Sequence, residues 1–387
     1  MLLLDTGKEW GGGTNSMIEL LKRLDRARFA VTACFYHDYP RGSSTLAVEL
    51  AAIGVPLMVM PVRSQPLWAK MAKELARGLL GWHRRWRAAA VFRIELCWRI
   101  RPRARALAEV LRQGGYTLLY MNNQPASNLE GYLAAMSTGV AVVQHCRVEP
   151  VVNAFERDQV NRTAAAVLCV SEGVRDALIR QGVRRELCRV IHNGIDVSQT
   201  MPDAQGLPGV APGKLVVGVV ASLMKRKAID HLLRAVARQP AAEVPHVLVV
   251  GDGPEATALR RLAERLGISE RVRFRGRVTD AELVSLYNTA RAVYYGPIDE
   301  DFGLVTVEAF TAAKPVVTVA DAGGVLELVE DGRTGLVVPR PEPSAVGAAI
   351  DRVLSDESLA RRLGEAGRDR VASIRWDRVV QELLSDA

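Results

Sequence analysis

The chain lacks any apolar run long enough to cross a membrane. The longest, Leu215–Met224, has about ten residues, whereas a membrane-spanning helix needs roughly eighteen or more. Residues 1–5 also lack the basic lead, the apolar region and the small-residue cleavage site of a secretory signal. We therefore expect a cytoplasmic protein that reaches a membrane, if at all, only from its surface.

Cysteine is scarce, and its spacing is not that of a metal site or a disulfide framework. The chain has five cysteines, an odd number, and no Cys-x-x-Cys pair. We expect reduced, mostly buried thiols, because structural zinc sites and disulfide-rich domains need paired spacings. The five are Cys34, Cys97, Cys146, Cys169 and Cys188.

Acidic residues are rare in one segment, which is strongly basic as a result. The net charge of the chain is +8, but thirteen basic residues and three glutamates between Arg63 and Arg112 give that segment +10. Four of the six tryptophans also lie there. Helical stretches that combine lysine and arginine with tryptophan and leucine suit an anionic membrane surface. Two alternative interpretations stay open, a nucleic-acid groove and a solvated basic face. The partner we expect for residues 63–112 is the membrane, not nucleic acid.

The apolar pattern alternates short β-branched runs with helix-length segments in two sets, which predicts parallel sheets covered on both faces. Proline and glycine are frequent at 198–213, so we expect a linker there. The prediction is two doubly wound α/β domains that face each other across a cleft. The expected strands are 31–36, 56–62, 118–122, 140–145, 165–171 and 189–195, then 215–222, 246–251, 272–278, 292–295, 315–319 and 335–339.

The densest motif of the chain lies between Tyr295 and Pro315. A strand ends there at a proline-containing loop, and a helix is predicted to begin near Gly303. Free amides at a helix start form an anion site suited to a diphosphate. Glu300 in the loop and Glu308 in the helix can face the same ligand, one of them near its phosphate-linked group and the other able to accept hydrogen bonds from vicinal hydroxyls. The alternative is an ordinary acidic helix N-terminus.

Two further loops in the second half have the composition of a phosphate site. Residues 222–227 read Ser-Leu-Met-Lys-Arg-Lys after the first strand of that half. Residues 251–256 resemble a dinucleotide fingerprint, but the next strand ends in arginines instead of the acidic residue that a nicotinamide site uses. An NADP-dependent oxidoreductase therefore stays open as an alternative.

The first half has its own candidate groups. Three glycines at 11–13 precede an amphipathic helix, so the backbone there can approach an anion closely; a flexible turn is the alternative. His145 ends the strand 140–145, and a histidine at the carboxyl edge of a sheet is a candidate for catalysis or substrate contact.

These motifs, in this order, resemble the retaining, family-4 type of GT-B glycosyltransferases, and the resemblance covers nearly the whole chain. It implies a Rossmann-like acceptor-side domain at 1–197, the linker at 198–213, and a Rossmann-like nucleotide-sugar domain at 214–371. It also implies that the C-terminal helix, within 372–387, crosses back onto the first domain. The remaining motifs that carry it are 170–175, 190–196, Gly276, Gly323–Gly324, Glu327 and 331–336.

The resemblance also implies a role for each candidate residue. Lys227 would neutralise the donor diphosphate, aided by amides after Gly303, and Glu308 would hold the ribose hydroxyls. Glu300 and His145 would contact the transferred sugar, and these two with Lys227 form the expected catalytic set. The donor-binding set is Gly12, Gly13, Ser222, Lys227, Gly251, Gly253, Arg277, Val278, Phe302, Gly303, Leu304, Val305 and Glu308, with the base read by backbone near Arg277 and Val278.

One position departs from the family pattern. Ser222 stands where the family usually has an arginine, five residues before the lysine, and a serine cannot replace a bidentate phosphate contact. Lys225 or Arg226 could reach the phosphate instead. A catalytically silent, membrane-associated binding protein is the alternative that this change leaves open.

No cofactor or metal is expected. The string Asp299-Glu300-Asp301 has the form of the D-x-D metal motif of the other major transferase fold, but it lies late in the chain, in a half that already supplies cationic phosphate ligands. We expect metal-independent transfer of a sugar from a nucleotide-diphosphate sugar to a lipid-linked or glycan acceptor at the inner membrane face, in cell-surface polysaccharide or glycolipid synthesis.

Overall fold

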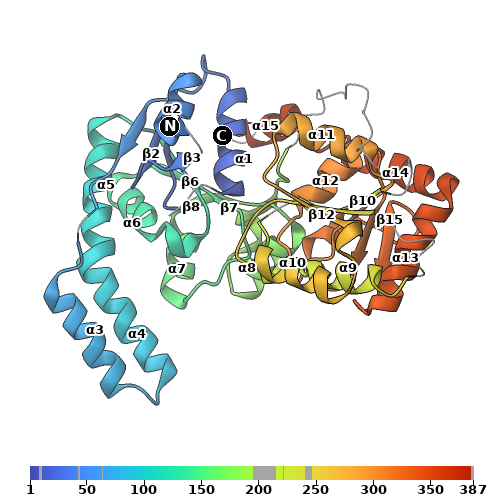
Figure 1. The fold of residues 1–387 in the computed structure, drawn as a ribbon. Helices are drawn as coiled ribbons and strands as arrows, with labels where there is room; N and C mark the ends of the chain where they lie inside the picture. The colour runs from blue at the N-terminus through green and yellow to red at the C-terminus, as the bar shows by residue number, and fades with distance from the viewer. Residues whose placement is uncertain are drawn as a thin grey trace. The chain divides into compact units, whose positions relative to one another are not determined.

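The computed structural model describes residues 1–7, 11–41, 44–62, 64–194, 215–220, 222–239 and 246–384. The chain forms two compact units, Met1–Ile191 and His192–Ala387 (Figure 1). The expected linker at 198–213 lies outside the described residues, as do Arg63 and the end of the motif at 190–196. The predicted packing of 372–387 on the first domain stays a prediction.

The core of the first unit is a seven-stranded parallel sheet in the order β5-β2-β1-β6-β7-β8-β9. The interior strand β1 pairs with β2 and with β6, with Leu3 opposite Ala33 and Tyr120. Strand β1 is fully buried, which three consecutive leucines suit. The strands are β1 Leu2–Leu4, β2 Thr32–Phe35, β5 Leu57–Val59, β6 Leu118–Asn122, β7 Ala141–Cys146, β8 Ala164–Cys169 and β9 Cys188–Val190.

Helices connect these strands, and two of them, α7 and α8, begin with a side-chain cap. Asn153 caps α7 by accepting a hydrogen bond from the Glu156 amide at 3.0 Å, and the Glu156 carboxylate accepts from the Asn153 amide at 2.8 Å. Ser171 caps α8 in the same way. The helices are α1 Gly12–Arg23, α2 Leu46–Ala52, α5 Arg101–Gln113, α6 Leu129–Thr138, α7 Ala154–Thr163 and α8 Glu172–Arg180.

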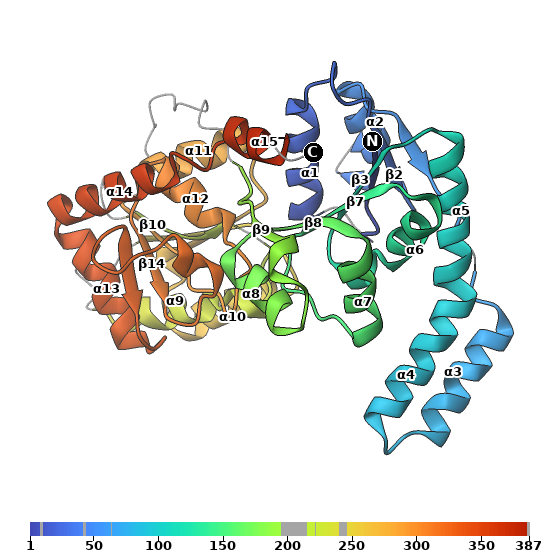
Figure 2. The ribbon, with the colours of Figure 1, turned by 180° about the vertical axis from the view of Figure 1, so that it is seen from behind.

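A helical hairpin, α3 Leu67–Leu79 and α4 Arg84–Glu95, projects from the first unit away from its sheet (Figures 1 and 2). Helix α4 continues through a single π-helical turn, η1 Leu96–Ile100, into α5. Helix α3 buries only Ala69 and Lys73, and α4 buries none of its residues. Glu95 lies between Lys73 and Arg99 and pairs with both, which ties the base of the hairpin to η1.

The second unit contains a six-stranded parallel sheet in the order β12-β11-β10-β13-β14-β15. Its strands are β10 Leu215–Val220, β11 His246–Val250, β12 Val272–Gly276, β13 Ala292–Tyr294, β14 Val316–Val319 and β15 Gly335–Val338. The helices around it are α9 Ile229–Val236, α10 Ala256–Arg265, α11 Asp280–Thr289, α12 Leu304–Thr311, α13 Pro343–Ser355, α14 Glu357–Val371 and α15 Trp376–Leu384. This doubly wound pattern confirms the predicted fold class.

Each of the twelve apolar runs expected to be a strand overlaps one, and among the strands of the two large sheets the sequence missed only the short β1. Within the described residues, no helix is both long and apolar enough to cross a membrane.

Candidate active site

Lys227 is the buried cation at the carboxyl edge of the second sheet. It ends a short turn, Lys225–Lys227, between β10 and α9, and only 6% of it is exposed. Its Nζ donates to the Glu300 Oε2 at 2.6 Å and to the Tyr295 Oη at 2.9 Å. A buried ammonium is costly unless it is paired and hydrogen-bonded, so these two partners are what allow Lys227 to occupy this position.

The charges around Lys227 oppose one another. Burial lowers the pKa of the Lys227 ammonium, and the Glu300 carboxylate acts against that shift. Arg226 adds a second, more exposed cation, with nitrogens 3.9 Å from Glu300 and from Asp301. The edge therefore carries two cations beside two carboxylates, a set that can exchange a carboxylate partner for a phosphate.

The loop that carries Glu300 has a fixed and unusual backbone. Asp299 has a φ of 50° and Gly303 a φ of 82°, both in the left-handed region. The Gly324 amide donates to the Glu300 carbonyl at 2.6 Å. A Cβ on Gly323 would lie 2.6 Å from that same carbonyl oxygen. The segment with Gly323 and Gly324 can therefore approach the Glu300 loop only because both residues are glycines.

Helix α12 starts directly after Gly303, at the same edge. The first-turn amides of an α-helix have no intrahelical acceptor and carry a partial positive charge. Leu304 and Val305 provide such amides. Since Gly303 also follows the Glu300 loop, the cation and the helix start share one edge, which is the arrangement that an anion site needs.

Glu308 lies farther along α12 and has a partner that the sequence analysis missed. The buried hydroxyl of Tyr287, on α11, donates to the Glu308 Oε2 at 2.8 Å. Burial, with the nearby carboxylate, raises the pKa of Tyr287 far above its usual value, so the phenol stays protonated and acts as a donor. Tyr287 and Tyr295 gave no signal in the sequence, because a tyrosine in a helix or after a strand is typical of a core position.

The loops after β10 and β11 brace each other. The Leu223 amide donates to the Asp252 carbonyl, and the Glu255 amide donates to the Leu223 carbonyl, both at 2.9 Å. A Cβ on Gly253 would lie 2.6 Å from the Leu223 amide nitrogen. Gly253 is therefore needed for close packing of the two loops, and Ser222 is left exposed at their end.

The remaining donor-side positions lie at the same ends of the strands. The Gly251 amide donates to the Gly276 carbonyl at 2.7 Å, which joins the ends of β11 and β12. Arg277 is exposed and Val278 half-buried just beyond. Phe302 is only 3% exposed, and its ring stacks on His192 with 5.1 Å between centroids, so its side chain contributes packing.

In the first unit, His145 is the last residue but one of β7, which ends at Cys146, and it is buried. Its Nδ1 forms a hydrogen bond with the Tyr120 hydroxyl at 2.5 Å, while its Nε2 has no partner among the residues that the structure describes. Burial, and secondarily the Arg147 charge, hold the pKa of His145 well below its usual value. The imidazole is thus neutral near pH 7 and can donate or accept one hydrogen bond.

Gly12 and Gly13 form the first turn of α1 instead of the expected loop. Gly11 has an extended backbone, with φ −141° and ψ −175°, and caps the helix, so the glycines after it adopt helical geometry. An added Cβ on Gly12 would meet nothing within 4 Å, whereas one on Gly13 would lie 3.7 Å from the Arg147 side chain. The amides of this helix start still suit an anion.

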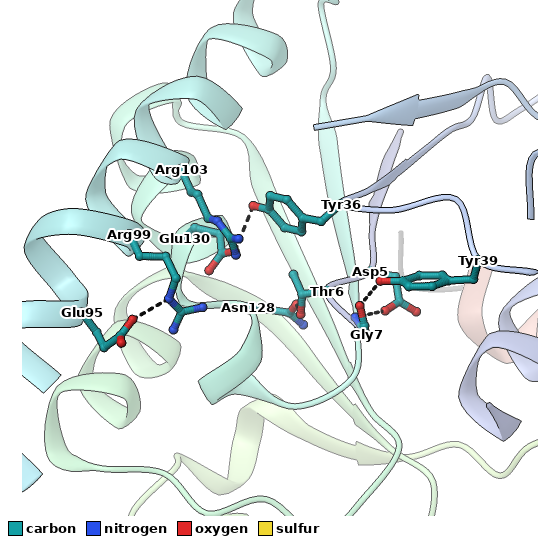
Figure 3. Close-up of polar contacts among 10 residues, drawn as sticks. All are labelled: Asp5, Thr6, Gly7, Tyr36, Tyr39, Glu95, Arg99, Arg103, Asn128 and Glu130. Atoms are coloured by element: carbon teal, nitrogen blue, oxygen red, sulfur yellow. Dashed lines mark hydrogen bonds and ion pairs between the residues drawn. The ribbon is translucent and has the colours of Figure 1, made fainter. Parts of the chain in front are cut away.

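Asp5 is a buried carboxylate that the sequence analysis did not single out. Its carboxylate accepts from the Gly7 amide at 2.7 Å and from the Asn122 and Asn123 side chains at 2.7 and 2.5 Å. Asn122 in turn accepts from the Arg147 Nε at 2.9 Å. These bonds join the ends of β1, β6 and β7, and Figure 3 shows Asp5 beside Gly7 where β1 ends.

Each unit thus gathers polar groups at the carboxyl ends of its own strands. The second unit brings Lys227 and Glu300 together beside the start of α12, while Glu308 pairs with Tyr287. The first unit links the Gly13 segment to the strand of His145 through Asn122 and Arg147. Among the described residues, no three His, Cys, Asp or Glu side chains are grouped to hold a metal ion.

Family models match both halves of the chain. The model described as "Glycosyltransferase Family 4" matches residues 10–199, and the model described as "Glycosyl transferases group 1" matches residues 207–370.

Curated relatives and solved structures agree with these matches. A D-inositol 3-phosphate glycosyltransferase of Nocardia farcinica is 30% identical over 86% of this chain and 72% of its own. One of Streptomyces bingchenggensis is 30% identical over 59% of this chain and about half, 54%, of its own. Anabaena HepE, solved with UDP and glucose, has 23% identity and a TM-score of 0.74, covering 99% of this chain and 98% of its own. A Rickettsia africae glycosyltransferase has 17% identity and a TM-score of 0.77, covering 99% and 97%.

Two doubly wound units with these neighbours define the fold as that of a GT-B glycosyltransferase. The chain belongs to the group 1 family of glycosyltransferases, and it is a transferase enzyme.

The two glutamates should differ in what they control. Glu308, held by Tyr287, should affect nucleotide binding, and Glu300, paired with Lys227, should affect turnover. We expect Glu308→Ala to raise the donor KM about tenfold or more, and Glu300→Ala to lower kcat with a smaller change in KM. Tyr287→Phe should reproduce a milder form of the Glu308→Ala effect. Steady-state kinetics with varied donor measure both constants, and equal changes in the two variants would contradict these roles.

Proposed function

We propose that the protein transfers a sugar, with retention of configuration, from a nucleotide-diphosphate sugar to a lipid-linked or glycan acceptor at the cytoplasmic membrane face. The observation that carries the donor side is the buried Lys227 ammonium, paired with Glu300 beside the start of α12. The similar protein HepE was solved in complex with UDP-glucose, which supports a nucleotide-sugar donor for this chain.

The proposed chemistry uses charge at the leaving group. The transition state resembles an oxocarbenium ion, and negative charge grows on the departing diphosphate. Lys227 and the α12 amides stabilise that charge more than they stabilise the bound donor, which lowers the barrier. Glu308 holds the ribose, and Glu300 accepts hydrogen bonds from the sugar.

His145 completes the proposal on the acceptor side. The Tyr120 hydroxyl fixes the imidazole through Nδ1, and the neutral ring offers Nε2 to the transferred sugar. The acceptor hydroxyl attacks the face that the diphosphate leaves and passes its proton to the departing phosphate, so no nucleophilic carboxylate is required. We propose that transfer is independent of metal. Lys227 and Arg226 supply the positive charge that a metal ion would otherwise supply, and they also take the part of the arginine that the family usually has where this chain has Ser222.

The α3–α4 hairpin supports a membrane-bound acceptor. Leu67, Met71, Leu75 and Leu79 recur every four residues of α3, so they lie along one face. All four are more than 60% exposed, and Trp82 is 91% exposed. An exposed apolar stripe on α3, followed by the basic start of α4 with Arg84, Arg85 and Arg87, suits insertion among anionic lipid headgroups.

A second candidate acceptor is a small phosphorylated polyol. The curated relatives are named for D-inositol 3-phosphate, and one of them aligns with 86% of this chain. Such an acceptor needs no membrane, so membrane binding and acceptor specificity separate the two candidates.

Donor and acceptor screens test the proposal directly. A donor that binds the native state raises the melting temperature, so we expect a shift with one class of nucleotide-diphosphate sugar. Transfer of labelled sugar to membrane lipid extract is then expected, with inositol 3-phosphate as the competing acceptor. Failure of every donor both to shift the melting temperature and to be consumed would overturn the transferase function proposed for this site.

The hairpin makes a separate prediction about membranes. Each basic residue near an anionic surface contributes about 1 kcal/mol, so reversing the charge of Arg84, Arg85 and Arg87 should weaken binding by at least about 3 kcal/mol. Cosedimentation with anionic and neutral vesicles at low and high salt measures it.

The matched control reverses three exposed arginines of the second unit, Arg261, Arg265 and Arg352, and should leave membrane binding nearly unchanged. Wild-type protein that stays in the supernatant with anionic vesicles at low salt would contradict the proposed docking. So would equal losses in the two triple variants.

A further inference from the structure

A small cavity lies in the first unit at the base of the hairpin. None of the roles proposed above involves this cavity. It has a volume of about 50 Å³ and opens at the carboxyl ends of β2 and β5, next to η1 and α5. One water needs roughly 10–15 Å³ of such volume, so the cavity has room for a group of about phosphate size. Its lining is Tyr36, Met60, Pro61, Trp98, Arg99, Pro102, Arg103 and Ala106.

The polar groups of this cavity are hydrogen-bond donors. Arg99 and Arg103 are four residues apart, and Figure 3 shows both side chains projecting from successive turns toward Tyr36 and Asn128. The Trp98 Nε1 is buried and has no acceptor among the described residues. An indole N–H and two guanidinium groups can only donate, so the ligand they suit is an acceptor of hydrogen bonds.

The two arginines are held in place differently. Arg103 lies 4.0 Å above the Tyr36 ring and 3.6 Å from the buried Glu130 carboxylate, and only 19% of its side chain is exposed. The Tyr36 hydroxyl donates to that carboxylate at 2.9 Å. Arg103 is therefore a pre-positioned part of the wall.

Arg99 is the more accessible cation, with 38% of its side chain exposed. It donates to Glu95 through Nε at 2.7 Å, and its terminal nitrogens find no acceptor within the described part of the chain. Glu95 also pairs with Lys73, so this group of three keeps one positive charge. A guanidinium with unused donors suits the tetrahedral oxygens of a phosphate.

The helix geometry at this point is also unusual. Trp98 and Arg99 belong to the π-helical turn η1, and single π turns recur at functional sites. Directly beyond it, α4 and α3 form the hairpin with its exposed apolar stripe. A phosphate at the base of the hairpin would thus lie at the boundary between a lipid surface and the protein.

We propose that Trp98, Arg99 and Arg103 form a binding site for a phosphate group of the acceptor. This inference rests on the proposed transferase function and adds that its acceptor is a phosphate ester. The phosphate belongs either to a lipid headgroup that the hairpin brings to the site or to a free phosphate ester, and the chemistry of the site is the same for both.

The test observes the Trp98 indole N–H by NMR in the full-length protein, with Trp98→Phe to assign its signal. The probes are glycerol 3-phosphate and dihexanoyl phosphatidic acid below its micelle concentration, with glycerol as the uncharged control. We expect both phosphates, and not glycerol, to move the signal. Arg99→Gln should weaken phosphate binding about tenfold, because it removes a charge-assisted contact.

Arg105→Gln is the matched control, since Arg105 is an exposed arginine of the same helix that does not line the cavity. It should leave phosphate binding within about twofold of wild type. Arg99→Lys keeps the positive charge at this position. It should retain more phosphate binding than Arg99→Gln, which would show that the weaker binding of Arg99→Gln comes from the lost charge and not from misfolding. Tighter binding of the lipid probe than of glycerol 3-phosphate would assign the phosphate to a lipid, and equal binding to a free ester.

An indole signal that neither phosphate moves would overturn the proposal, as would equal weakening by Arg99→Gln and Arg105→Gln. Nucleotide binding by the second unit is measured in parallel. Phosphate binding without any nucleotide binding would support this phosphate site and contradict the proposed transferase function. Nucleotide binding without phosphate binding would support the transferase function and contradict this phosphate site.

Discussion

The buried ion pair of Lys227 and Glu300 is the interaction on which the functional edge of the second unit depends. An isolated buried ammonium costs several kcal/mol, so the turn that carries Lys227, the end of β13 with Tyr295 and the Glu300 loop must all meet. That requirement explains the left-handed backbone at Asp299 and Gly303. Because Gly303 is also the start of α12, the same loop brings a cation and a helix N-terminus to one edge.

The first unit meets a similar constraint with a different set of groups. A buried carboxylate, Asp5, is held by two asparagine side chains and a backbone amide, and Asn122 links it to Arg147. In both units the polar groups lie where parallel strands end, which is where doubly wound sheets bind ligands. A charged side chain in the apolar core of either unit would lose its hydration without gaining a partner. The charged groups therefore lie at the strand ends, where they find hydrogen-bond partners.

The sequence predicted the sheets well, because long β-branched runs have few other stable environments. It missed β1, whose three leucines are too short a run to stand out. Motif order singled out Lys227, Glu300 and Glu308 as candidates, but not Tyr287, which pairs with Glu308 across 21 positions of the chain. Hydrogen-bond partners of that kind depend on how helices pack, and neither periodicity nor composition contains that information.

We propose that Lys227 is the cation that receives the donor diphosphate. Calorimetric titration with the nucleoside diphosphate that most stabilises the protein tests this role, in wild type, Lys227→Gln and the control variant Arg261→Gln, which changes an exposed arginine of α10. A Lys227→Gln/Glu300→Gln variant removes the unpaired carboxylate that the single change leaves. We predict that both Lys227 variants bind the nucleoside diphosphate about tenfold or more weakly than wild type, and that Arg261→Gln binds it within about threefold of wild type. Unchanged affinity in the Lys227 variants would contradict the account.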